Sequence, residues 1–298
     1  MSNVEPRFGR LITAMVTPFN DERELDLDRA QALATRLIEG GNDSLIINGT
    51  TGESPTVFYP QKIELFRAVV EAVGGKASVI ANVGDNCTAD TVNFAKDVAK
   101  LGVDGFMCVV PYYNKPPQEG MYQHFKTIAD AVELPIILYN IPGRCVVNME
   151  AETTLRLAND CENVIAVKEA SGKMDQIATI AAAAPEGFSV YSGDDSATYD
   201  IMRLGGAGVI STTGNVAPER MKELVTKCAE GKWDEAWAAH EALLPLMNGL
   251  FETSNPILVK EALKLVGFPV GGVRLPLIDA TAEQSARLAS IMREVGVL

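Results

Sequence analysis

One lysine stands at the end of an apolar run, a placement that suits nucleophilic chemistry. Lys168 directly follows the segment NVIAV (163–167). An amine in apolar surroundings has its ammonium form disfavoured, so its pKa falls from about 10.4 and a neutral amine can attack a ketone or aldehyde. Lys168 is therefore a candidate Schiff-base nucleophile. The alternative is a structural lysine paired with a carboxylate such as Glu169, although adjacent strand residues point to opposite faces, which argues against that partner.

The segment GTTGES (49–54) has the composition of a small-anion site. Its two glycines let backbone N–H groups converge, and the Thr50 and Thr51 hydroxyls add donors, so a carboxylate fits such a nest. The same segment also fits a tight turn in which Ser54 or Glu53 caps the next helix. The two interpretations are compatible.

Phenol groups are the natural proton carriers in this chain, because it has only two histidines. Tyr112, Tyr113 and Tyr139 all fall at the ends of apolar runs. A Tyr-Thr-Tyr relay would pass protons between a bound imine and water, whereas the alternative for Tyr112 and Tyr113 is to cover an interface. Arg144, after the turn in YNIPGR, suits bidentate binding of a carboxylate or an ordinary surface position.

These side chains lie far apart in the chain, and the hydrophobic pattern indicates how they meet. Eight short runs rich in Val and Ile alternate with segments of helical periodicity. The runs begin near residues 11, 44, 78, 104, 135, 163, 188 and 207. Such alternation implies parallel strands joined by right-handed crossovers, and eight units predict an α/β fold of the (β/α)8 TIM barrel type. The competing open, doubly wound sheet usually has a Gly-rich phosphate loop after its first strand, where this chain has MVTPFNDE.

The barrel units end near residue 230, and the remaining segments have helical periodicity with a Pro or Thr near their starts. We therefore predict a catalytic barrel over residues 1–230 and a C-terminal helical domain over residues 231–298. In TIM barrels the active site is built at the C-terminal ends of the strands, where the residues singled out above lie.

Composition excludes several classes of function. A formal net charge of −13 without a basic run argues against nucleic acid as a partner. The chain has no apolar stretch of about 18 residues and no signal-peptide pattern at its start, so we expect a cytoplasmic protein without a membrane partner. Five scattered cysteines and two histidines indicate reduced thiols and no metal site.

Five linked motifs together resemble those of the dihydrodipicolinate synthase family, within the N-acetylneuraminate lyase superfamily of class I pyruvate aldolases. The resemblance spans about residues 8–270 and rests on GTTGES (49–54), PYYNKP (111–116), YNIPGR (139–144), VKEASG (167–172) and SGDD (192–195). It implies a lyase that condenses pyruvate with L-aspartate 4-semialdehyde to 4-hydroxy-tetrahydrodipicolinate, the first committed step of diaminopimelate and lysine biosynthesis. It also implies that no cofactor is needed beyond the covalent imine of pyruvate.

The resemblance assigns a role to each motif residue. Lys168 would form the imine and Tyr139 would be the acid/base residue nearest to it. Thr50 would link Tyr139 to Tyr113, which in the family reaches into the site of a neighbouring subunit. A homo-oligomer is therefore implied, with the family's usual tetramer, a dimer of dimers, as the expected form.

Substrate binding follows from the same resemblance. Thr50 and Thr51, with the backbone at Gly193 and Ile210, would surround the pyruvate unit. Arg144 would guide the carboxylate of L-aspartate 4-semialdehyde. Thr51 and Arg144 also favour the synthase over the runner-up, an N-acetylneuraminate lyase or another sugar-acid aldolase, and the retained catalytic residues argue against a non-catalytic sensor of small acids.

Inhibition by lysine is a separate question. Asn86, Asp90 and Tyr112 resemble the family's inhibitor cleft between subunits. Lys62 stands where sensitive bacterial enzymes often have His, and a cation there would repel the ammonium group of the inhibitor. We predict weak or absent inhibition.

Overall fold

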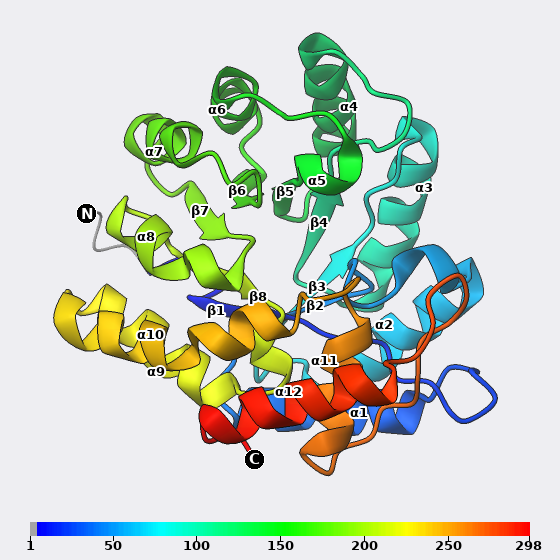
Figure 1. Ribbon diagram of the computed structural model, residues 1–298. Helices are drawn as coiled ribbons and strands as arrows, with labels where there is room; N and C mark the ends of the chain where they lie inside the picture. The colour runs from blue at the N-terminus through cyan, green and yellow to red at the C-terminus, as the bar shows by residue number, and fades with distance from the viewer. Residues whose placement is uncertain (1–4) are drawn as a thin grey trace.

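The chain folds into a closed barrel of eight parallel strands, β1 to β8, each hydrogen-bonded to the next and β8 to β1. The computed structural model describes residues 5–298 (Figure 1). The strands are β1 (Leu11–Ala14), β2 (Ser44–Ile47), β3 (Ser78–Asn82), β4 (Gly105–Val109), β5 (Ile136–Asn140), β6 (Val164–Glu169), β7 (Ser189–Ser192) and β8 (Gly208–Ser211). Each strand begins within one residue of a run expected from the sequence, so the predicted TIM barrel is confirmed.

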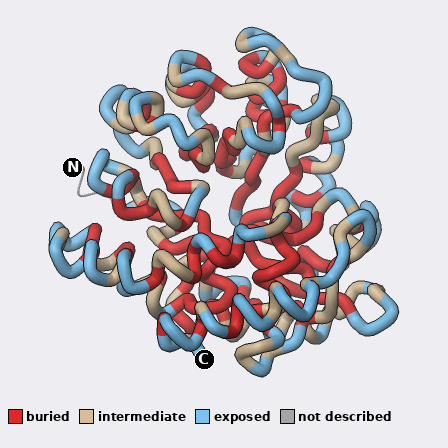
Figure 2. The backbone as a smooth tube through the Cα atoms, viewed as in Figure 1, coloured by how far each residue is buried: buried red, intermediate tan, exposed pale blue. Residues whose placement is uncertain are grey.

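Helices surround the barrel and connect its strands. They are α1 (Leu27–Glu39), α2 (Tyr59–Val73), α3 (Thr88–Val98), α4 (Gln118–Ala131), α5 (Pro142–Cys145), α6 (Ala151–Asp160), α7 (Met174–Ala183), α8 (Thr198–Arg203) and α9 (Pro218–Ala229). Short 3-10 helices follow three of the strands, η1 (Ser54–Thr56), η3 (Asp195–Ala197) and η4 (Thr213–Asn215), and a fourth, η2 (Ala99–Leu101), continues α3. Figure 2 shows the strands buried and the outward faces of the helices exposed, as the helical spacing of apolar residues predicts.

Two apolar layers form the core, and alternation along each strand separates them. The barrel interior is filled by a small cluster that includes Ile137, Tyr139, Ala166, Tyr191 and Ile210. A larger cluster packs the outer faces of the strands against the helices. Because side chains alternate along a strand, every second residue of β5 and β6 enters the interior.

Three further helices follow the barrel: α10 (Trp233–Gly249), α11 (Ile257–Leu265) and α12 (Ala282–Glu294). α10 packs on α9, and α12 packs on both α10 and α11. Thr281 caps α12 in the manner that the sequence predicts, since its side chain accepts from the Gln284 N–H and the Gln284 side chain accepts from the Thr281 N–H. In Figure 1 the segment around α11 lies over the same end of the barrel as α5. Within residues 5–298, no helix has the length and apolar character needed to span a bilayer.

Candidate active site

Lys168 points into the barrel from the C-terminal end of β6. It alternates with Val167, which packs in the outer layer, and its side chain is 6% exposed. Burial lowers the pKa of its amine from 10.5 to about 8; the Asp195 carboxylate opposes this shift and the Arg144 guanidinium reinforces it. A neutral amine is therefore accessible near physiological pH.

Glu169, the alternative carboxylate partner for Lys168, lies on the opposite face of β6. Glu169 points out of the barrel and accepts hydrogen bonds from Asn140 Nδ2 at 2.6 Å, Gln176 Nε2 at 3.0 Å and Ser171 Oγ at 3.2 Å. Those three donors satisfy the carboxylate on the outer face of the strand. The paired-lysine interpretation with Glu169 is therefore wrong, for the reason that strand alternation gives.

Tyr139 stands beside Lys168 on the neighbouring strand. The two residues are register partners of β5 and β6, and Lys168 Nζ lies 4.4 Å from the centroid of the Tyr139 ring. Burial raises the pKa of the phenol to about 12, against weaker opposing effects of Arg144 and of a hydrogen bond with Thr50. Tyr139 thus keeps its proton at neutral pH, as a proton donor must, and it contacts the two groups that the relay hypothesis requires of it.

The GTTGES segment forms the turn between β2 and η1. A Cβ on Gly52 would lie 3.0 Å from the Asn48 Cα, so the turn is tight enough to need glycine there. Among residues 5–298, the backbone N–H groups of Thr50 and Thr51 donate to no other residue. These free donors sit at the mouth of the barrel, which is the condition for binding a small anion.

The side chain of Thr51 is held by residues from two other parts of the chain. Its Oγ1 accepts a hydrogen bond from Asn255 Nδ2 at 2.9 Å and lies 3.4 Å from Thr212 Oγ1. Thr212 is itself fixed, because its N–H donates to the buried Asp195 carboxylate at 3.0 Å.

Gly193 packs directly against the first methylene groups of the Lys168 side chain. A Cβ at this position would lie 2.7 Å from Ala170 Cβ and 3.1 Å from Lys168 Cγ. The Gly193 N–H donates to the Glu169 carbonyl at 2.8 Å, so its own carbonyl is the group left to face a ligand. Glycine here leaves the lysine side chain room to extend.

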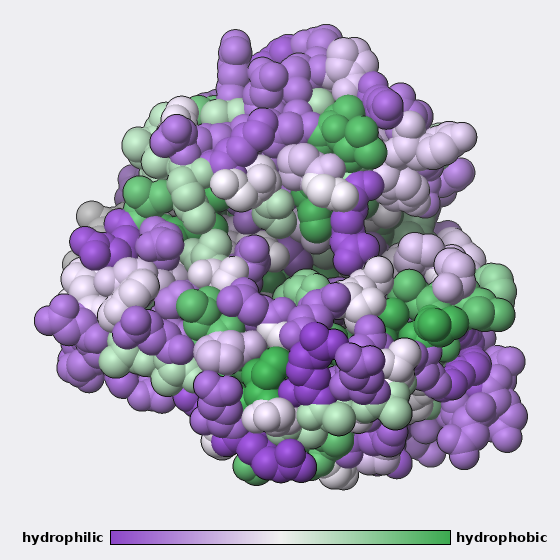
Figure 3. Space-filling model, viewed as in Figure 1, coloured by the Kyte–Doolittle hydropathy of each residue, from purple (hydrophilic) through white to green (hydrophobic). Residues whose placement is uncertain are grey.

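A cavity brings most of the predicted site residues together. It is lined by Ala14, Gly49, Thr50, Thr51, Met107, Tyr139, Ile141, Arg144, Lys168, Gly193, Thr212, Phe251 and Asn255. Arg144 is exposed at the rim on α5, and the surface is hollowed near the centre of this face (Figure 3). Six of the eight residues predicted from the sequence thus share one cavity.

The other two predicted residues lie elsewhere. Tyr113 is 87% exposed, has a positive φ of 72° and is not part of the cavity lining. Ile210 is buried in the barrel interior beneath the cavity. The Tyr-Thr-Tyr relay is therefore not assembled by these residues within one copy of the chain.

One local prediction is wrong. Neither Ser54 nor Glu53 caps the helix that follows, because no side-chain cap bond is made at η1 and the N-cap residue of α2 is Phe58. The Glu53 carboxylate instead pairs with Lys260 at 2.5 Å.

Strand-end reasoning missed the contribution of the C-terminal segment. Phe251 and Asn255 line the cavity from the loop between α10 and α11, so the element directly before them is a helix and not a strand. The only local signal is the polar TSN (253–255) before Pro256, which does not by itself indicate a site. Within the part of the chain described, no cluster of three or more His, Cys, Asp or Glu side chains has the arrangement of a metal site.

Comparison with known proteins places this geometry in a family. A family model described as "Dihydrodipicolinate synthetase family" matches residues 7–295. The 4-hydroxy-tetrahydrodipicolinate synthase of Moorella thermoacetica is 53% identical over 98% of this chain and 100% of its own length. That of Symbiobacterium thermophilum is 50% identical over the same shares of the two chains.

Solved structures agree. The dihydrodipicolinate synthase of Cyanidioschyzon merolae, whose structure is described as having lysine bound, matches with a TM-score of 0.97 and 45% identity over 99% of this chain and 100% of that one. The enzyme of Thermotoga maritima matches with a TM-score of 0.95 and 42% identity over 97% and 99% of the two chains. Family model, relatives and structures cover nearly the whole chain, and the chain belongs to the dihydrodipicolinate synthase family.

Proposed function

We propose that this chain condenses pyruvate with L-aspartate 4-semialdehyde to give 4-hydroxy-tetrahydrodipicolinate, with Lys168 as the covalent nucleophile. The observation that carries the assignment of Lys168 is its buried amine, whose pKa is lowered to about 8, in the same cavity as Tyr139 and the Thr50–Thr51 turn. Membership of the family supports the two substrates and a reaction that needs no cofactor beyond the imine.

The reaction starts with attack of the Lys168 amine on the ketone carbon of pyruvate. The adduct then loses water to give an iminium. The departing hydroxyl needs a proton, and Tyr139 donates it because burial keeps its phenol protonated. The iminium then withdraws electrons, so the methyl group gives a proton to Tyr139, which lost its own in the previous step, and the methyl carbon becomes the nucleophilic carbon of an enamine.

The enamine carbon adds to the aldehyde carbon of the second substrate, and the new alkoxide takes a proton. The amino group of that substrate then attacks the imine carbon, which closes the ring and releases Lys168 as a free amine. One water leaves for each pair of substrates joined. Each proton transfer occurs near the imine, where Tyr139 and Thr50 are in contact.

Two parts of the cavity suit the two substrate carboxylates. The N–H groups of Thr50 and Thr51, which have no acceptor in the described part of the chain, form the candidate site for the pyruvate carboxylate together with the two hydroxyls. The carbonyl of Gly193 and the backbone of Ile210 complete its surroundings in this proposal. Arg144 lies at the rim, and its charge acts on both Lys168 and Tyr139, which supports a role in holding the second carboxylate close to the imine.

We further propose that the active form is a homotetramer in the cytoplasm, built as a dimer of dimers. Tyr113 is too exposed to act within its own chain, and an exposed aromatic held in a left-handed turn suits insertion into a neighbouring site. Sedimentation analysis and activity assays of wild type and Tyr113→Phe test this. A tetramer whose Tyr113→Phe variant loses activity while retaining assembly supports the shared relay, and a fully active monomer would contradict it.

One experiment tests the function and its alternative together. The protein is incubated with pyruvate, reduced with borohydride and digested, and the modified peptide is identified by mass spectrometry. We expect a pyruvyl adduct on Lys168, turnover with aspartate semialdehyde and none with N-acetylneuraminate. A wild-type protein without an adduct would remove the assignment, and cleavage of N-acetylneuraminate would favour the lyase instead.

A further inference from the structure

A buried ion pair outside the cavity joins the GTTGES turn to the C-terminal segment. Glu53 Oε1 lies 2.5 Å from Lys260 Nζ of α11, and each side chain is 2% exposed. Removing two charges from water is costly, and an apolar pair of similar volume is often as stable or more so. A contribution to stability therefore does not by itself explain why this ion pair is present.

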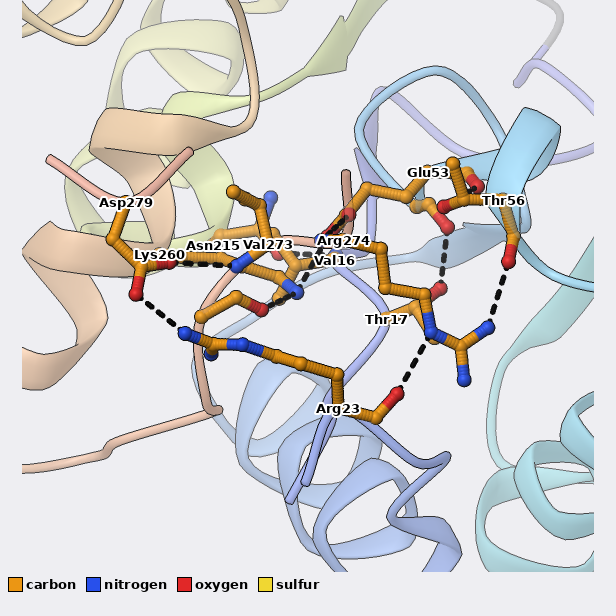
Figure 4. Close-up of polar contacts among 12 residues, drawn as sticks. Val16, Thr17, Arg23, Glu53, Thr56, Asn215, Lys260, Val273, Arg274 and Asp279 are labelled. Carbon is orange, nitrogen blue, oxygen red and sulfur yellow. Dashed lines mark hydrogen bonds and ion pairs between the residues drawn. The ribbon is translucent and has the colours of Figure 1, made fainter. Parts of the chain in front are cut away.

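Both charged groups also bind the backbone on either side of Val273. Glu53 Oε2 accepts a hydrogen bond from the Arg274 N–H at 2.9 Å, and Lys260 Nζ donates to the Gly272 carbonyl at 2.8 Å. The Arg274 guanidinium in turn donates to the Thr56 carbonyl at 2.7 Å. Figure 4 shows these groups converging between the turn and the segment around Val273. The turn is thus held on both sides of η1.

The backbone of Glu53 connects this ion pair to Thr50 and Thr51. Its φ of 55° lies in the left-handed region, where a residue with a side chain is strained and persists only when its surroundings impose the conformation. The Glu53 N–H donates to the Thr50 carbonyl at 3.1 Å, and Thr17 Oγ1 donates to the Gly52 carbonyl at 2.6 Å. Displacement of the Glu53 carboxylate would therefore remove one of the main restraints on the turn that carries Thr50 and Thr51.

The same C-terminal stretch also contacts Thr51 directly. Asn255, which is 7% exposed, donates to Thr51 Oγ1 at 2.9 Å and lies two residues before α11 begins. Lys260 lies on α11 itself. One helix and its N-terminal approach thus hold the turn at two points, Thr51 and Glu53.

Lys260 itself is unsuited to be a second nucleophile. Its pKa falls to about 8, mainly through burial, as that of Lys168 does. Its amine, however, is occupied by Glu53 and the Gly272 carbonyl, and it does not line the cavity. The pair therefore acts on the site through the backbone of the turn.

We propose that Glu53 and Lys260 are positioning residues, which hold Thr50 and Thr51 in the geometry that binds pyruvate. This inference rests on the proposed function, because it takes the two threonines to be the pyruvate site. It gives the C-terminal helices a direct part in activity: they supply the partner charge that fixes the turn.

The test compares two double variants that both remove the charges. Glu53→Met with Lys260→Met leaves the Arg274 N–H without an acceptor, whereas Glu53→Gln with Lys260→Met keeps an oxygen for it. We expect the first to raise the KM for pyruvate at least tenfold while changing the KM for aspartate semialdehyde less than twofold. The second keeps the Arg274 contact but lacks the α11 partner, so it should recover part of that loss and stay at least threefold above the wild-type pyruvate KM; full recovery would remove Lys260 from the positioning role. Lys264→Met, an exposed position on the same helix, is the matched control and should leave both constants unchanged.

Each outcome bears on the proposal separately from the function. Circular dichroism and thermal melts first establish that the variants are folded at the assay temperature. An unchanged pyruvate KM in the Met–Met variant, equal losses for both substrates, or failure of both double variants to fold would overturn the positioning role. Borohydride trapping on Lys168 in the wild-type protein is run alongside, and only its failure would count against the proposed function.

Discussion

The pH dependence of imine formation should report directly on the burial of Lys168. Its pKa falls from 10.5 to about 8 because the barrel mouth excludes water from the amine. The difference corresponds to about 3 kcal/mol of selection against the ammonium form. At pH 7 the neutral fraction is then roughly one tenth, against roughly one in 3,000 for an ordinary lysine. The net shift, in which burial is the largest cause, thus raises the concentration of the attacking species about 300-fold.

Only the neutral amine attacks, which fixes the sign of the effect. The rate constant for imine formation should rise about tenfold per pH unit below pH 8 and level off above it. The plateau should extend to at least pH 10, because the pKa of Tyr139 is raised to about 12 and the proton donor remains in place. Rapid mixing with pyruvate, quenching with borohydride and mass spectrometry of the Lys168 peptide measure this rate.

Substitution of Arg144 tests the same pKa of Lys168 in a chosen direction. Its charge lowers the pKa of Lys168, so Arg144→Met should move the break in the profile to higher pH. Arg156→Met, at a partly exposed position on α6, is the control and should leave the break in place. A wild-type profile that keeps rising to pH 10 would refute the reasoning, since it would mean that the cavity leaves Lys168 an ordinary lysine.

Four further results are expected. Tyr139→Phe keeps the buried ring but removes the proton donor, so kcat should fall roughly 10²- to 10⁴-fold with little change in thermal stability. Gly193→Ala places a Cβ 3.1 Å from Lys168 Cγ, and borohydride trapping should slow at least tenfold. Arg144→Met should raise the KM for aspartate semialdehyde about tenfold to hundredfold and spare that for pyruvate in initial-rate assays. Millimolar L-lysine should inhibit weakly or not at all, because Lys62 lines the cavity that contains Asp90, and potent inhibition would contradict this.

The sequence predicted the barrel well because its strongest signal is local. Runs of Val and Ile are the mark of parallel strands buried on both faces, and all eight runs form strands. Strand alternation also gave the direction of Lys168, and the neighbouring strands then placed Tyr139 beside it. Residues that follow strands converge because a barrel collects all its strand ends at one mouth.

The remaining features depend on contacts that no local pattern encodes. Asn255 follows a helix rather than a strand, and it meets Thr51 only because the chain returns across the barrel mouth after 204 residues. Glu53 has the position and chemistry of a cap, yet a buried ammonium and the Arg274 N–H compete successfully for its carboxylate. A charged partner in a dry site outweighs a helix N-terminus, and only the tertiary fold supplies that partner.

The charge distribution explains how an acidic protein can attract two acids. The chain has a net charge of −13, but the only charged side chains in the lining of the described cavity are Lys168 and Arg144, both basic. Surface carboxylates farther than about 10 Å are screened by salt, whereas a cation inside a partly dry cavity is not. The Asp195 carboxylate lies close enough to act on Lys168, yet its Oδ2 accepts from the N–H groups of Thr212 and Thr213. A cavity arranged in this way offers two cations and the N–H groups of Thr50 and Thr51 to an entering carboxylate, while the nearby Asp195 is hydrogen-bonded through its Oδ2.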